Sequence, residues 1–169
     1  MTGPFPSRVP VRPLSPDGLD GIGRVIGTHD RPRIINGGVS EKWDRLVPPE
    51  AFGHPMNLGI LRTSPESLAV SRLERHLHTH QFFVPMAPLR YVVVVAGNDP
   101  AGPRADQLRA YLSDGTTGVD FHPGTWHSPL IPLDEPVPFV TAMRDTEVPD
   151  LDLRELDRPI ALTLKGEPQ

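Results

Sequence analysis

A chain of 169 residues is long enough for one domain and short for two. Its 17 Lys and Arg against 21 Asp and Glu give a formal charge of −4, which disfavours nucleic acid and anionic membranes as partners. Because the chain has no cysteine, disulfides, thiolate zinc sites and iron–sulfur clusters are excluded, and any metal must be bound by His, Asp, Glu or Gln. The first residues carry prolines where a signal peptide is apolar, and no run approaches the roughly 20 apolar residues of a membrane span, so we expect a cytoplasmic protein.

Proline and glycine are frequent and are spread along the whole chain. The 22 Pro and 15 Gly residues interrupt helices but suit short strands joined by turns. We therefore expect a single all-β domain over residues 1–169, built as a sandwich, jelly roll or barrel, with an irregular proline-rich arm over residues 1–13.

The first predicted element is one of only two short helices. It begins at Ser15-Pro16-Asp17, which offers an N-cap, a proline at the first helical position and an early acid, and it runs toward Gly21. The second short helix is predicted near Pro149. All other elements are expected to be strands.

Apolar alternation and β-branched runs locate these strands. Residues 67–76 alternate with a period of two, which places Glu74 and His76 on one face together with Leu68, Val70 and Arg72. The run at 91–96 (YVVVVA) is typical of a strand buried on both faces, and Asp114-Gly115 predicts a turn. Residues 106–112 fit either a helical face or a strand, and we take them as a strand. Further strands are predicted at 58–61, 81–85, 118–122, 137–143 and 160–164.

Five of the seven histidines fall into two groups. The segment LERHLHTHQFFVPM contains the first group and GVDFHPGTWHSPL contains the second, at positions 76, 78 and 80 and at positions 122 and 127. Imidazole is a common metal ligand and the side chain best suited to proton transfer near pH 7. Two such groups in a β protein predict one shared site.

The spacing of these groups resembles that of the cupins, small β-barrels that hold a metal in the barrel mouth. Cupins carry a motif of the form His-X-His followed by Glu and Gly, and a second motif containing Pro-X-Gly-X-X-His. Residues 124–127 match the end of the second motif, with Pro123 displaced by one position. In the first motif, the resemblance puts Glu74 in place of the first histidine and Gln81 in place of the glutamate. It therefore implies the ligand set Glu74, His76, Gln81 and His127.

A rival register places His78 and His80 in the His-X-His positions. The carboxylate position then falls on Val84 or Pro85, neither of which can coordinate a metal, so we prefer the first register. His78 and His80 are then exposed turn residues or support the site from behind the ligands.

Most of the chain, from about Leu14 to its end, also resembles one family of cupin enzymes, the ureidoglycolate lyases. The similarity is carried by order, spacing and residue type in Ile35-Asn36-Gly37, in Leu73-Glu74-Arg75-His76 with Gln81, Phe83 and Pro85-Met86, in Leu108-Arg109-Ala110, in Gly118-Val119, and in His122 with Trp126-His127 and Pro129-Leu130. The chain departs from the usual family pattern at Leu77-His78-Thr79-His80, at Asp120-Phe121 and at Pro123-Gly124.

The resemblance implies an enzyme that cleaves (S)-ureidoglycolate to glyoxylate and urea in allantoin and purine breakdown, a carbon–nitrogen lyase of the amidine-lyase type. It implies a homodimer and a divalent metal, with nickel favoured and manganese, iron or zinc also compatible with imidazole and oxygen ligands. The substrate is a carbinolamine, so one proton must leave its hydroxyl and one must reach the departing nitrogen.

Roles for individual residues follow from the same resemblance. His76 and His127 are candidate ligands or general bases. His122 is the candidate acid or a residue that supports the ligands from behind. Arginine binds carboxylates bidentately, so Arg75 and Arg109 are candidates to bind the substrate carboxylate. The full set of candidate contacts to the small-molecule substrate is Asn36, Arg75, Gln81, Arg109 and Trp126.

Several alternative interpretations stay open at this stage. Glu74 is equally suited to pairing with a neighbouring arginine, Gln81 to satisfying buried backbone groups, and Trp126 to the core. At the level of function, a cupin can bind a small organic acid without turning it over, and a site of two His and one carboxylate also suits a metal-dependent oxygenase.

Overall fold

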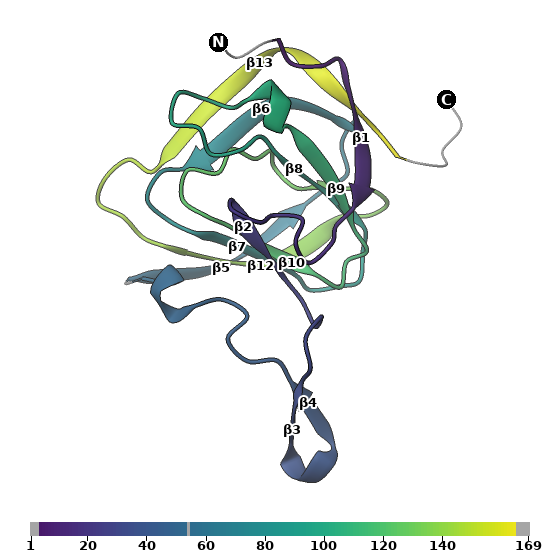
Figure 1. Ribbon diagram of the computed structural model, residues 1–169, viewed down its shortest axis with the longest axis vertical. Helices are drawn as coiled ribbons and strands as arrows, with labels where there is room; N and C mark the ends of the chain where they lie inside the picture. The colour runs from purple at the N-terminus through teal and green to yellow at the C-terminus, as the bar shows by residue number, and fades with distance from the viewer. Residues whose placement is uncertain (1–3, 54, 165–169) are drawn as a thin grey trace.

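The computed structural model describes residues 4–53 and 55–164, and almost all of its regular structure is β (Figure 1). One sheet has six strands, in the order β11 (Ile131–Pro132), β8 (Tyr91–Val95), β9 (Arg109–Ser113), β1 (Arg8–Pro13), β13 (Leu151–Thr163) and β6 (Ala69–His76). A second sheet has five, in the order β2 (Gly23–Ile26), β10 (Gly118–Phe121), β7 (Gln81–Pro85), β12 (Val137–Arg144) and β5 (Met56–Thr63).

A two-stranded hairpin of β3 (Arg33–Ile35) and β4 (Ser40–Lys42) projects away from these sheets, at the bottom of Figure 1. The only helical segments in the described residues are three 3-10 turns: η1 (Asn36–Gly38) at the hairpin tip, η2 (Pro49–Ala51) and η3 (Ala105–Gln107). None of them is long and apolar enough to cross a membrane.

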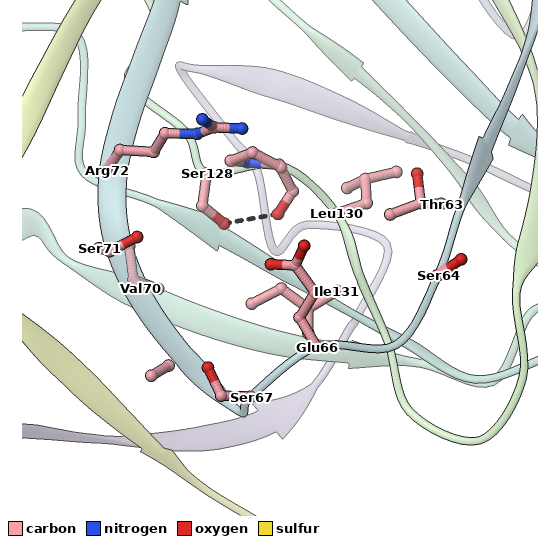
Figure 2. A pocket seen from close by; sticks show the side chains of 12 residues that line it. Thr63, Ser64, Glu66, Ser67, Val70, Ser71, Arg72, Ser128, Leu130 and Ile131 are labelled. Carbon is pink, nitrogen blue, oxygen red and sulfur yellow. Dashed lines mark hydrogen bonds between the residues drawn. The ribbon is translucent and has the colours of Figure 1, made fainter.

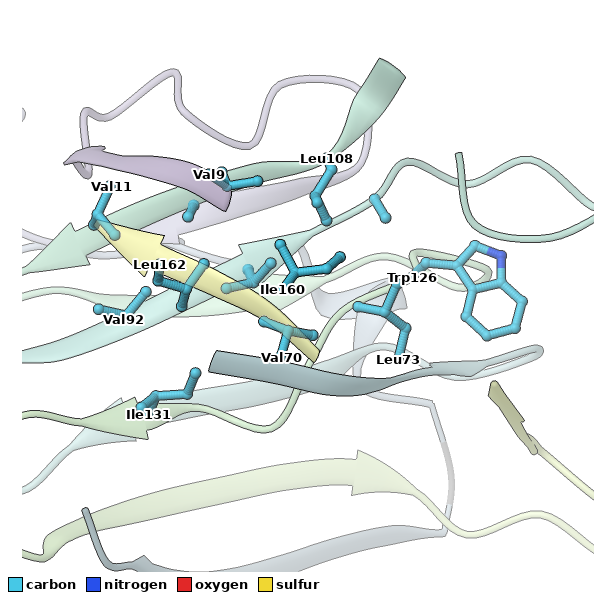
Figure 3. Packing of buried hydrophobic residues seen from close by; sticks show 13 residues of the cluster. Val9, Val11, Val70, Leu73, Val92, Leu108, Trp126, Ile131, Ile160 and Leu162 are labelled. Atoms are coloured by element: carbon cyan, nitrogen blue, oxygen red, sulfur yellow. The ribbon is translucent and has the colours of Figure 1, made fainter. Parts of the chain in front are cut away.

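The six-stranded sheet curls around its own core cluster. The chain at His127 forms isolated β-bridges to Glu74 on β6 and to Val95 on β8, which brings the two sides of the sheet together. The enclosed side chains are apolar residues of β1, β6, β8, β9 and β13, with Trp126 at one end (Figure 3). Burial of this cluster supplies hydrophobic stabilisation at about 25 cal/mol per Å² of apolar surface.

Strand β8 is buried on both faces, as its valine run predicts. Val92 and Val94 face the first cluster, whereas Tyr91, Val93 and Val95 face a second cluster built with Phe83, Phe121 and Phe139 on the inner face of the five-stranded sheet. Strand β8 of the six-stranded sheet thus contributes to both core clusters, one on each of its faces.

The predicted all-β, cupin-type barrel is confirmed, and so are most predicted strands. The turn at Asp114-Gly115 forms with Gly115 at a φ of 87°, where a side chain would be strained. Residues 106–112 begin as the 3-10 turn η3 and continue as strand β9.

The two predicted helices do not form. Residues 16–22 make a series of tight turns that bury Leu19, with backbone bonds such as Gly18 N–H to Ser15 O. Near Pro149 the chain enters β13 directly, because Leu151 and the following residues pair with β6 from His76 onward. Near Pro149, tertiary strand pairing outweighs the local helix signal.

The expectation of an irregular arm over residues 1–13 is wrong for residues 8–13. Residues 8–13 form β1, which pairs in parallel with both β9 and β13 and buries Val9 and Val11. Residues 1–3 lie outside the described residues.

Candidate active site

A cavity of about 220 Å³ lies between the two sheets. The six-stranded sheet contributes Glu74 from β6, and the five-stranded sheet contributes Gln81 from the start of β7. His127 enters from the connection between β10 and β11. The remaining lining residues are mostly apolar or carry hydroxyl groups: Leu61, Thr63, Phe83, Ser128, Pro129, Leu130 and Thr141.

His127 is held tightly within this region. Its ring is 2% exposed and stacks on Phe121 with 4.1 Å between ring centroids. Nδ1 lies 2.9 Å from Thr125 O, so the neutral ring donates its Nδ1–H to that carbonyl and keeps the lone pair on Nε2. Burial lowers the pKa of His127 to about 4, which keeps the ring neutral at physiological pH.

The Nε2 atom of His127 faces two oxygen atoms. Gln81 Oε1 lies 3.0 Å from it and Glu74 Oε1 lies 3.8 Å from it. A neutral Nε2 lone pair, an amide oxygen and a carboxylate oxygen all accept rather than donate, and such a donor set suits a divalent cation. These three residues therefore fit the metal that the sequence resemblance implies.

His76 has a different environment from the other three predicted ligands. Its ring stacks against His127 with centroids 6.3 Å apart, but it does not line the 220 Å³ cavity. Its Nδ1 lies 3.0 Å from Asp150 Oδ2, and the same carboxylate accepts hydrogen bonds from Thr79 Oγ1 and the His78 backbone N–H, both at 2.6 Å. Although burial opposes it, these hydrogen bonds hold the pKa of Asp150 below its usual value. Asp150 thus fixes the orientation of His76 behind His127.

A second cavity, of about 300 Å³, shares four lining residues with the first: Thr63, Ser128, Pro129 and Leu130. In Figure 2, Arg72 of β6 and Glu66 extend into this cavity, close to Ser128. The Arg72 guanidinium has no hydrogen-bond or ion-pair partner among the described residues. It lies two positions before Glu74 on the same strand, so the backbone positions of these two residues are about 6.6 Å apart on one face.

The candidate substrate contacts other than Gln81 do not lie at the cavity. Arg75 is 8% exposed, pairs with Asp152 at 2.9 Å and stacks 4.4 Å over the ring of Trp126, which is fully buried in the core. Arg109 donates to the carbonyls of residues 106 and 108, and Asn36 lies at the tip of the projecting hairpin, where it donates to Ser40 Oγ. Each of these side chains has a structural partner instead.

His122 also lies outside the cavity. It gathers with His80 and Asp120 into a group whose candidate ligand atoms all lie within 4.8 Å of one another, an arrangement that fits a divalent metal. Val119 and Phe121 point into the core beside Asp120, so the alternation of β10 directs Asp120 to the outer face of the five-stranded sheet.

Sequence patterns do not indicate that Arg72 lines a cavity or that Asp150 contacts His76. Arg72 shares the predicted face of Glu74, which suggests only a pair between these two side chains. Asp150 lies 74 positions from His76, and no local pattern connects two side chains at that separation. Only the pairing of β13 with β6 brings them together.

The strand order and the His127 cavity define a cupin-like barrel, and the comparisons with known proteins agree. The structure resembles the crystal structure of a dTDP sugar isomerase from Desulfovibrio desulfuricans, with a TM-score of 0.52 at 18% identity, over 82% of this chain and 87% of that one. At this identity the resemblance establishes the fold alone.

The sequence comparisons identify the family. The family model for ureidoglycolate lyase matches residues 6–163. The chain is 37% identical over 141 residues to a ureidoglycolate lyase of Burkholderia cepacia, covering 79% of this chain and 76% of that protein. It is 32% identical over 157 residues to one of Agrobacterium fabrum, covering 90% and 93%. The chain belongs to the ureidoglycolate lyase family.

Proposed function

We propose that this protein is a ureidoglycolate lyase that splits (S)-ureidoglycolate into glyoxylate and urea. The supporting observation is the convergence of Glu74, Gln81 and His127 on one cavity in a chain that belongs to this family. The cavity of about 220 Å³ suits a small polar substrate, and its polar groups gather at one end. Family membership favours the lyase over the two alternatives, a non-catalytic cupin and an oxygenase.

Glu74 is the group that moves the proton. Its carboxylate accepts the proton of the substrate hydroxyl as the carbon–oxygen double bond of glyoxylate forms and the carbon–nitrogen bond breaks. The same carboxyl then delivers this proton to the departing nitrogen, which completes urea. Atoms and charge balance over the cycle, and Glu74 returns to its starting state.

His127, Gln81 and Glu74 would hold a divalent metal, for which nickel remains the favoured identity. When bound, such a metal polarises the substrate hydroxyl and lowers its pKa. The neutral state of His127 leaves Nε2 free for this role, while the hydrogen bond to Thr125 fixes the ring. His76, held by Asp150, supports His127 from behind and is a positioning residue in this proposal, not a ligand.

Arg72 is the proposed anchor for the substrate carboxylate. It lacks a partner among the described residues, and it lines the cavity that continues into the His127 cavity. A bidentate pair between guanidinium and carboxylate would orient the substrate over Glu74. This assignment replaces Arg75 and Arg109, whose donors are already used.

The proposal includes the cellular setting implied by the family. We expect a cytoplasmic homodimer that acts in allantoin breakdown on a small-molecule substrate, without nucleic acid or membrane partners. The outer face of the five-stranded sheet favours self-association, because Leu58, Ile60, Val84 and Met86 are all exposed there by 39% or more.

Turnover of racemic ureidoglycolate tests the proposed activity. The purified protein should release glyoxylate and urea well above the spontaneous rate, from one enantiomer only. Glu74→Gln should lower kcat by about 100-fold or more, because general acid–base catalysis contributes roughly 10²–10⁴. Dialysis against a chelator should reduce the rate if a metal takes part.

The control for this assay is Glu41→Gln, an exposed glutamate on β4 of the projecting hairpin. It should retain the wild-type rate. No turnover by the folded wild-type protein, with or without added Ni²⁺ or Mn²⁺, would remove the lyase proposal, and a full rate in Glu74→Gln would remove Glu74 from the proton transfer.

A further inference from the structure

A second polar group lies on the outer face of the five-stranded sheet, away from the cavity between the sheets. Asp120 of β10 is completely buried and its two oxygens contact different partners. Oδ1 lies 2.9 Å from His80 Nδ1, and Oδ2 lies 2.8 Å from Arg24 Nη1 and 3.9 Å from His122 Nε2. His80 immediately precedes β7 and His122 immediately follows β10, so the pairing of these two strands assembles the group.

The ring nitrogen of His122 is unsatisfied. Nε2 is buried and has no hydrogen-bond partner among the described residues. Leaving a buried polar atom without a hydrogen bond is unfavourable. In the tautomer that carries its proton on Nδ1, Nε2 presents a lone pair toward this group. A bound cation would satisfy this atom.

The candidate ligand atoms of the group lie close enough together to surround one cation, since all of them are within 4.8 Å of one another. Two ligands at about 2.0–2.1 Å from a zinc ion are roughly 3.3 Å apart. His80 Nδ1 lies 2.9 Å from Asp120 Oδ1, and His122 Nε2 lies 3.9 Å from the other oxygen, Oδ2, so small side-chain movements would bring the ligand atoms to that separation. The two imidazole rings meet edge-on with centroids 5.1 Å apart, as two ligands of one ion can.

We propose that His80, Asp120 and His122 form a binding site for a divalent transition-metal ion of the zinc type, separate from the cavity of Glu74 and His127. Two imidazoles and one carboxylate leave a fourth position for water, which the partial exposure of both histidines permits. Binding at His80 Nδ1 requires the tautomer that carries its proton on Nε2.

Arg24 is the competing partner of the buried carboxylate. Its side chain is 37% exposed, so it can turn toward solvent when a cation takes Oδ2. The site would join the start of β7 to the end of β10. Gln81 follows His80 directly and His127 lies a short connection after His122, so a metal here would also stabilise the segments that carry both cavity residues.

Zinc titration of the full-length, chelator-dialysed protein tests the site. Calorimetry should give one Zn²⁺ equivalent that is lost, or bound at least tenfold more weakly, in His80→Gln and in His122→Gln. Both histidines are partly exposed, so these variants should fold. The matched control is His78→Gln, an exposed histidine in the same turn, which should bind Zn²⁺ as wild type does.

Two further measurements separate this site from the cavity. His127→Gln should keep the equivalent that His122→Gln loses, and Zn²⁺ should raise the Tm of His127→Gln but not that of His122→Gln. Wild-type zinc binding in both His80→Gln and His122→Gln would overturn the proposal. Loss of all zinc binding in His127→Gln alone would overturn it as well, because every equivalent would then belong to the cavity.

Discussion

Burial of one imidazole has a consequence for the stability of the protein. His127 is neutral in the folded state because burial lowers its pKa to about 4, whereas an unfolded chain carries it at the ordinary value of 6.5. Between these values the unfolded state binds more protons than the folded state. The free energy of unfolding therefore decreases as the pH falls through this range.

We expect the metal-free protein to lose on the order of 3 kcal/mol of unfolding free energy from this residue as the pH falls from about 6.5 to about 4. Urea unfolding at intervals between pH 7 and pH 4.5 measures the slope. His122, whose pKa burial also lowers, adds to the slope in the same direction.

His127→Gln should flatten this dependence, because glutamine cannot titrate, and His78→Gln should retain it, because His78 is exposed. An unchanged slope in His127→Gln would show that the ring is not held neutral by burial. The variant should also be less stable at pH 7, since it loses the stacking on Phe121.

Substitutions of the single residue Arg72 test whether its side chain binds the substrate carboxylate. Arg72→Ala should raise KM for ureidoglycolate by roughly 10- to 100-fold, because a hydrogen bond between charged groups is worth about 1.5–3 kcal/mol. Arg72→Lys should restore only part of the loss, since lysine cannot form the bidentate pair. Steady-state kinetics measures both effects.

The matched control is Arg109→Ala, whose guanidinium bonds to local backbone carbonyls. It should leave KM unchanged. An increase in KM confined to Arg109→Ala would support the anchor chosen from sequence and would exclude Arg72.

At the scale of elements, the alternating sequence pattern of β6 predicts the facing of some of its side chains correctly and of others wrongly. Arg72, Glu74 and His76 follow the predicted alternation, because a regular pleat fixes it. Val70 was predicted on the same face, but it packs with Leu73 in the core of the six-stranded sheet. The pairing with β13 shifts register between Glu155 and Ile160, and this irregularity turns Val70 to the other face.

Strand β1 shows why some strands cannot be predicted from the local sequence. Its prolines at positions 10 and 13 argue for an irregular segment, yet Val9 and Val11 alternate inward between two parallel neighbours. A parallel partner is by necessity distant in the chain, so the segment carries no local signal of pairing. The core of the six-stranded sheet, with β9 and β13 on either side, decides this element.

At the scale of the whole molecule, the exposed apolar face of the five-stranded sheet is the surface on which we expect the proposed homodimer to form. Ile60 is 70% exposed and Leu58 is 65% exposed on β5, the edge strand of that sheet. Apolar side chains gathered in this way are typical of a surface that a second protein chain covers.

The double variant Leu58→Glu with Ile60→Glu should therefore convert the dimer to a monomer without unfolding it, as measured by sedimentation and circular dichroism. Paired charges in an apolar interface are costly to desolvate. Leu151→Glu, an exposed leucine on the other sheet, should remain dimeric. A wild-type monomer at micromolar concentration would contradict the proposed homodimer.

The sequence by itself determined the fold class, most strands, the family and the residues of the candidate site that local patterns mark. Proline spacing, β-branched runs and the period of two are local properties of the backbone, so they can be read without coordinates. The resemblance of the two histidine segments to the cupin motifs predicts that Glu74, His76, Gln81 and His127 share one site. Glu74, Gln81 and His127 line one cavity, and His76 does not.

Only the tertiary structure decided which charged side chains are free and which are already paired. Arg75, chosen from sequence, is bound by Asp152 and Trp126, whereas Arg72 has no described partner. In the same way, His122 joins His80 and Asp120 instead of the cavity. The physical reason is that burial and pairing depend on contacts between segments far apart in the chain, and strand register sets those contacts.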